Sequence, residues 1–258
     1  MLTRVAGADV WVAQEGEGPV SDLMIHCSLA RHTSLLPLVR ARKRSARLFD
    51  LPGHGQSADW TKGADFHAAT TDIATKLLPD APVHLVGHSF GGTVALRVAL
   101  ENPGRVRALT LIEPVLFAAA RGTREHAAHE AEFAPFTAAV QAGERMRAAE
   151  MFRGIWGEGD WPDLPERVKA HLAKRIHLIT LADPAIAEDN AGLLDAGRLE
   201  ALDIPVTLVR GRETRPVVGA IHAALAARLP QAREHVIAGA GHMVPLTHAS
   251  AVAAVMPD

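Results

Sequence analysis

Short runs of aliphatic and β-branched residues recur along the chain, each bounded by turn-forming residues. Most of these runs lack a strict alternation of apolar and polar positions, which is typical of strands in a parallel sheet covered by helices on both faces. Stretches with the spacing of amphipathic helices lie between them. The predicted strands are residues 22–27, 46–50, 83–87, 106–112, 205–210 and, more weakly, 234–237. The predicted helices are residues 67–78, 90–101, 216–229 and 245–255.

The alternation of strands and helices predicts an α/β fold with a mostly parallel sheet flanked by helices. Residues 3–14 are expected to add an antiparallel hairpin at its edge. Residues 114–203 interrupt the alternation, and a connection of about ninety residues is far longer than a usual crossover. Their helical patterns are residues 123–142, 144–156 and 164–181. We therefore predict a helical cap at 114–203, inserted into a core formed by residues 1–113 and 204–258.

Composition excludes several classes of protein. The 258 residues include 27 Lys and Arg against 29 Asp and Glu. The chain therefore lacks the excess of positive charge that is typical of proteins that bind nucleic acids. The single cysteine, Cys27, excludes an internal disulfide and a multi-thiolate metal site, and such usage is typical of a reducing cytosol. We see neither a signal-peptide pattern nor a stretch apolar enough to span a membrane. We expect a cytoplasmic protein without nucleic-acid or membrane partners.

The hexapeptide GHSFGG, residues 87–92, lies where the predicted strand 83–87 meets the predicted helix 90–101. A G-x-S-x-G sequence carries weight only in this strand–turn–helix context, where the turn exposes the serine hydroxyl and requires small neighbours. The alternative interpretation of this hexapeptide is a glycine-rich turn of a nucleotide-binding fold. The absence of a G-x-G-x-x-G spacing after the first strand argues against it. The pattern predicts Ser89 as a nucleophile.

A serine hydroxyl needs a base to take its proton. Because the chain has 14 histidines, we identify the candidate base by its position relative to the predicted strands and helices. His242 follows the last predicted strand in a glycine-rich loop that can bring its imidazole over the serine, whereas His248 falls within the predicted final helix. His88 adjoins the serine, but its side chain should point away from the hydroxyl. We predict His242 as the general base.

With these motifs the chain resembles the α/β-hydrolase fold superfamily, in its serine-hydrolase branch, over nearly the whole length. The order serine, acid, histidine also fits that family. Serine at the elbow differs from the aspartate of the family's dehalogenases and epoxide hydrolases. The segments that carry the resemblance are HCS at 26–28, FDLPGHGQS at 49–57, the elbow at 87–92 and GAGH at 239–242.

The resemblance implies an oxyanion hole formed by two backbone N–H groups. One belongs to Phe90, the residue after the nucleophile. The other belongs to the residue after a His-Gly pair, which here reads His26-Cys27, so that Ser28 matches the donor position. His26 itself is interpreted as a buried histidine that braces this loop.

The acid has two candidates. After the predicted strand 205–210, many members of the family carry an aspartate three residues beyond a glycine, but this chain has Thr214 there. Glu213 lies one residue out of register. Glu113 ends the predicted strand 106–112, a place where some members carry the acid, and a carboxylate there needs a partner such as the imidazole. We favour Glu113, and Glu213 stays open.

The resemblance implies a cofactor-free and metal-free hydrolase that cleaves a carboxylic ester, or a related acyl bond, of a small and largely apolar substrate through an acyl-enzyme. A lactonase, a thioesterase, a C–C bond hydrolase and a hydroxynitrile lyase use the same arrangement. A non-catalytic small-molecule receptor on this scaffold is the alternative from another class. His126 and His129 are interpreted as part of a solvated cap helix and not as metal ligands.

Overall fold

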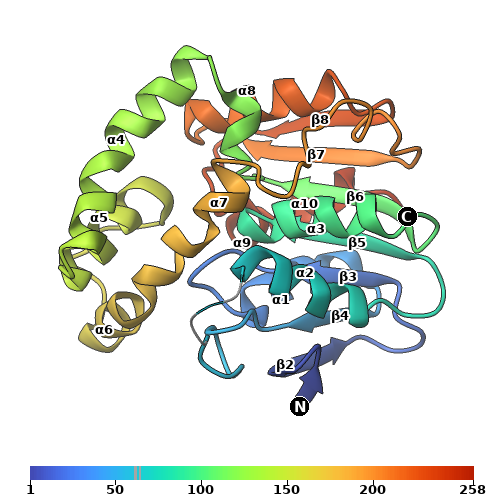
Figure 1. The fold of residues 1–258 in the computed structure, drawn as a ribbon. Helices are drawn as coiled ribbons and strands as arrows, with labels where there is room; N and C mark the ends of the chain where they lie inside the picture. The colour runs from blue at the N-terminus through green and yellow to red at the C-terminus, as the bar shows by residue number, and fades with distance from the viewer. Residues whose placement is uncertain (61–62, 64) are drawn as a thin grey trace.

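The computed structural model describes residues 1–60, 63 and 65–258. Its centre is an eight-stranded sheet in the order β1-β2-β4-β3-β5-β6-β7-β8 (Figure 1). β2 runs antiparallel to both of its neighbours, and the other neighbouring strands pair in parallel. The strands are β1 (Leu2–Val5), β2 (Ala8–Glu15), β3 (Asp22–Ile25), β4 (Ala46–Phe49), β5 (Val83–His88), β6 (Val106–Ile112), β7 (Val206–Gly211) and β8 (Ala232–Ile237).

Helices cover both faces of this sheet, which confirms the predicted fold class. α2 (Phe66–Lys76), α3 (Phe90–Glu101) and α8 (Pro216–Ala226) lie on one face, and α1 (Leu36–Arg42), α9 (Val244–Thr247) and α10 (Ala249–Val255) lie on the other. Successive residues of a strand point to opposite faces. Along β5, Leu85 therefore packs into one apolar cluster and Val86 into the other, and both are fully buried. Because both faces are covered, the strands read as continuous apolar runs.

The edge hairpin is confirmed as β1 and β2, joined by two residues with positive φ, Ala6 and Gly7. Two predicted helices are too long. The final helix is divided at His248, whose backbone is not helical, into α9 and α10. The helix predicted at 164–181 is α6 (Glu166–Arg175) followed by short 3-10 turns. The sequence analysis did not predict α1, a helix of seven residues.

The long connection between β6 and β7 contains helices and, among the residues described, no strand. We call its helices, η2 (Phe117–Ala120), α4 (Arg124–Gln141), α5 (Arg145–Trp156), α6 and α7 (Asp183–Ile186), the inserted helices. α4, α5 and α6 stand together on one side of the sheet (Figure 1). They pack around an apolar cluster of their own that includes Phe136, Ala148 and Ile176.

Candidate active site

The turn between β5 and α3 places Ser89 in a backbone conformation that side-chain-bearing residues rarely adopt, with φ 55° and ψ −120°. Its neighbours must be small. A Cβ atom on Gly87 would lie 2.1 Å from the carbonyl oxygen of Gly91, and one on Gly91 would lie 2.4 Å from that of Ile25. The N–H of Ser89 donates to the carbonyl oxygen of Ile112 at 2.9 Å, which ties the turn to β6. The strained turn is therefore held from both sides.

Glu113 follows β6 and is fully buried, and its carboxylate accepts three hydrogen bonds. Oε1 accepts the backbone N–H of Gly211 at 2.7 Å. Oε2 accepts the hydroxyl of Thr214 and the Nδ1–H of His242, the latter at 2.9 Å. With three donors, this buried carboxylate is fully hydrogen-bonded and keeps one orientation. The structure thus joins Glu113 to the imidazole that the sequence analysis proposed as the base.

Glu213 lies elsewhere. Its side chain is exposed, and its backbone N–H donates to the carbonyl oxygen of Ala240 at 2.9 Å. Thr214, which occupies the position where many family members carry an aspartate, instead donates its hydroxyl to Glu113. The loop after β7 therefore supports a carboxylate that comes from β6.

His242 is held at its backbone as well as at its ring. The carbonyl oxygen of His242 accepts the Nε2–H of His88 at 2.9 Å. Burial lowers the pKa of His88 to about 3, so this ring remains a neutral donor. On another side, the ring of Trp156 meets the ring of His242 edge to face, with centroids 4.7 Å apart. Hydrogen bonds at Nδ1 leave the Nε2 atom of His242 available to a substrate or a nucleophile.

The residues expected to form the oxyanion hole lie beside Ser89. Phe90 is the first residue of α3, and the first N–H groups of a helix have no partner within it. Ser28 and Cys27 line the same cavity as Ser89. His26 braces their loop, because its Nδ1–H donates to the carbonyl oxygen of Cys27 at 2.7 Å and its Nε2 accepts the N–H of Leu51 at 3.0 Å. Burial lowers the pKa of His26 to about 4 and raises that of Cys27 to about 12.

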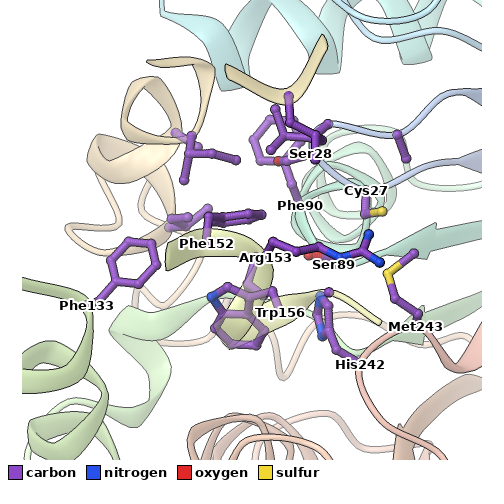
Figure 2. A pocket seen from close by; sticks show the side chains of 18 of the residues that line it. Cys27, Ser28, Ser89, Phe90, Phe133, Phe152, Arg153, Trp156, His242 and Met243 are labelled. Atoms are coloured by element: carbon purple, nitrogen blue, oxygen red, sulfur yellow. The ribbon is translucent and has the colours of Figure 1, made fainter. Parts of the chain in front are cut away.

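One cavity brings these groups together under the inserted helices (Figure 2). Ser89, His242, Phe90 and Ser28 line its floor, and aromatic side chains form much of its wall. The wall is not wholly apolar, because Arg153 and Asp183 also line it, and the sequence analysis identified neither. The spacing along α5 contained the signal for the arginine, since the cavity-lining residues repeat at helical intervals as Ala149, Phe152, Arg153 and Trp156.

The interpretation of His126 and His129 as solvated is wrong, since both are buried. The ring of His129 stacks on Phe117, with centroids 4.3 Å apart, and meets Trp156 edge to face. Burial, with the nearby His126, lowers the pKa of His129 to about 4. In residues 1–60, 63 and 65–258 we find no cluster of three or more side chains suited to a metal ion.

None of the helices among the described residues combines the length and the apolar character that crossing a membrane requires. A family model described as the alpha/beta hydrolase fold matches residues 34–249. Lipase LipV of Mycobacterium tuberculosis is 32% identical over an alignment of 271 positions, which covers 96% of this chain and 96% of that protein.

The pimeloyl-(acyl-carrier protein) methyl ester esterase of Neisseria meningitidis is also similar, at 32% identity over 218 positions, covering 81% of this chain and 80% of that protein. Among solved structures, carboxylesterase CesB (YbfK) from Bacillus subtilis superposes with a TM-score of 0.70 at 18% identity, covering 98% of this chain and 87% of that one. The chain therefore belongs to the α/β-hydrolase family, in the branch whose members hydrolyse esters.

Proposed function

We propose that Ser89 is the nucleophile of a carboxylic ester hydrolase that works through an acyl-enzyme. The observation that carries this proposal is the 2.9 Å hydrogen bond between Glu113 and Nδ1 of His242, a residue that lines the same cavity as Ser89. With Nδ1 protonated and bonded to the carboxylate, Nε2 is the atom that takes the serine proton. Glu113 also stabilises the imidazolium that results.

The reaction then runs in two halves. Ser89 Oγ bonds to the ester carbonyl carbon, and His242 returns the proton to the leaving alcohol as the C–O bond breaks. Water enters, gives a proton to His242 and attacks the acyl carbon. The bond between this carbon and Ser89 Oγ breaks, His242 passes the proton to Oγ, and the acid is released. The N–H groups of Phe90 and Ser28 hold the oxyanion in both halves. Loss of one such donor costs roughly 3 kcal/mol of transition-state stabilisation in other enzymes.

We assign a different role to each of two regions of the chain. Residues 1–113 and 204–258 form the catalytic core, and residues 114–203 form a cap that covers the cavity and excludes water from it. The partner is a small-molecule acyl substrate, and the residues named above carry the reaction without a cofactor. The single, buried, free Cys27 favours a cytoplasmic location.

Covalent labelling of the serine tests the proposal. We expect a fluorophosphonate to add one label per chain, measured by intact mass, and Ser89→Ala to abolish both the label and the turnover of p-nitrophenyl acetate. Ser28→Ala, which keeps its backbone N–H, is the matched control and should still be labelled. Labelling that persists in Ser89→Ala, with an unchanged melting temperature, would overturn the assignment.

A further inference from the structure

The guanidinium of Arg153 is the cation in the cavity wall. Its side chain extends from α5 across the cavity toward Ser89 and Cys27 (Figure 2). Its Nε atom is buried and has no hydrogen-bond partner. In the part of the chain that the structure describes, no carboxylate forms an ion pair with this guanidinium. A positive group with an unpartnered N–H donor therefore lines the cavity that also contains Ser89.

Two other arginines of the inserted helices have partners. Arg147 pairs with Glu144 at 2.7 Å, and Arg175 donates to the carbonyl oxygen of Gly53 at 2.9 Å. A charge that is partly removed from water without a partner is costly, so an unpaired guanidinium in an apolar wall calls for an anion from outside the chain. The planar donor group of arginine matches a carboxylate, which it can bind through two parallel hydrogen bonds.

The chain makes room for this orientation of Arg153. A Cβ atom on Gly157 would lie 2.3 Å from the Cδ atom of Arg153 and 2.8 Å from its Nε atom. The backbone of Gly157 is extended, with φ −93° and ψ −179°, a conformation open to any residue. The glycine is thus needed for close packing at the end of α5, where the arginine side chain lies against it.

Asp183 is the other charged residue in the wall, and it does not neutralise the arginine. No ion pair links the two side chains within the described residues. Burial, with a contribution from Glu188, raises the pKa of Asp183 to about 6.

We propose that the site selects esters whose acyl chain carries a second, ionised carboxylate, and that Arg153 binds this carboxylate. This inference rests on the proposed function, because it names the substrate class of the same site. The apolar wall accommodates the methylene chain between the two ends, and Ser89 attacks the esterified carbonyl. A neutral acyl chain of equal length fills the same space but leaves the guanidinium unpaired.

Matched pairs of methyl esters test the preference. Monomethyl esters of dicarboxylic acids with three to eight carbons are compared with methyl esters of the simple acids of the same length. We expect kcat/KM at the best length to favour the carboxylate-bearing ester at least about tenfold, the order of a charge-assisted hydrogen bond. Arg153→Gln should abolish the preference, mainly through KM, and Arg153→Lys should restore part of it.

Arg147→Gln is the matched control, since it removes the same charge from the same helix on the exposed side. It should leave the preference unchanged, which separates a local contact from long-range attraction. The inference is overturned if the wild type favours the neutral ester at every length, or if Arg153→Gln keeps the wild-type preference. Circular dichroism and thermal melting show whether each variant is folded.

A binding measurement keeps this inference distinct from the catalytic proposal. Calorimetry with the Ser89→Ala protein should detect adipate more tightly than hexanoate, and Arg153→Gln in that background should remove the difference. Preferential adipate binding without any ester turnover would overturn the proposed function alone. Turnover of neutral esters without a preference for carboxylate in either experiment would overturn this inference alone.

Discussion

The sheet core and the inserted helices hold their polar side chains in different ways. At the ends of the core strands, Glu113 accepts three hydrogen bonds, and His242 is held at its ring and at its carbonyl group. On the inserted helix α5, Arg153 is half-buried and lacks an ion-pair partner within the described residues. Groups that must keep one geometry through a reaction lie in the core, whereas a group without a partner is available to a ligand. We therefore expect the core to carry the chemistry and the inserted helices to select the substrate.

The largest expected effect comes from neutralising the buried carboxylate of the core. Glu113→Gln should lower kcat at least about 10²-fold with little change in KM, because the amide loses the charge that stabilises the imidazolium and can favour the wrong tautomer. Glu213→Gln, a change of the same shape on an exposed loop, should stay within a few-fold of wild type. Steady-state kinetics with p-nitrophenyl acetate measures both.

The reverse result, with Glu213→Gln inactive and Glu113→Gln active, would move the acid to the loop after β7. Thermal melting must accompany these kinetics, because a buried amide at position 113 also changes the stability of the fold.

Acid should destabilise the core strongly. Burial lowers the pKa values of His26 to about 4 and of His54 and His88 to about 3, below the ordinary value of 6.5. Between these values the unfolded chain binds more protons, so the free energy of unfolding is largest above pH 6.5 and falls as the pH drops toward 4. His26 alone contributes a loss of about 3 kcal/mol over that interval.

Urea unfolding followed by far-ultraviolet circular dichroism at pH 7.5, 6.5, 5.5 and 4.5 measures this loss. A free energy of unfolding that stays constant down to pH 4.5 would show that these histidines are not buried in the neutral form.

A smaller effect is expected from a substitution in the inserted helices, which is compared with a substitution in the core. Phe136 lies in the apolar cluster of the inserted helices, behind the cavity-lining Phe133 and Phe152. Phe136→Ala should raise KM for hexanoate esters about tenfold, because a large-to-small change loosens the packing behind the wall, and should leave fluorophosphonate labelling within about threefold. Leu208→Ala, in the core strand β7, should instead lower the midpoint of urea unfolding of the whole protein.

If Phe136→Ala slows labelling as much as it raises KM, the inserted helices also take part in the chemistry, and the division between the regions fails.

An effect of similar size, on kcat instead of KM, concerns His88, which positions the backbone of His242. His88→Leu removes one buried hydrogen bond and should lower kcat about tenfold, with KM nearly unchanged. His88→Gln keeps an N–H donor and should recover part of the loss. Kinetics with p-nitrophenyl acetate distinguishes the two, and equal activity of both variants with the wild type would remove His88 from the positioning of the loop.

Much of the fold could be predicted because its signals are local. Apolar runs indicated the parallel strands, and the hexapeptide at 87–92 indicated a tight strand-to-helix turn. The turn requires glycine at positions 87 and 91, because a Cβ atom at either position would clash with the backbone. The helix α1 has only seven residues and ends in a basic run, so its pattern is too short to stand out. The buried state of His129 was missed because two of its aromatic neighbours, Phe117 and Trp156, come from η2 and α5.

The amino-acid sequence by itself determined the fold class and the positions from which a serine and a histidine can act. Only the tertiary structure showed that Glu113, and not the exposed Glu213, contacts His242. The pairing of β6 with β7 brings Gly211 and Thr214 to a residue about one hundred positions away. Likewise, a charged residue on an amphipathic helix is ordinarily placed on its solvent face. Arg153 faces a cavity that it shares with Ser28 and Ser89, residues far from it in the chain.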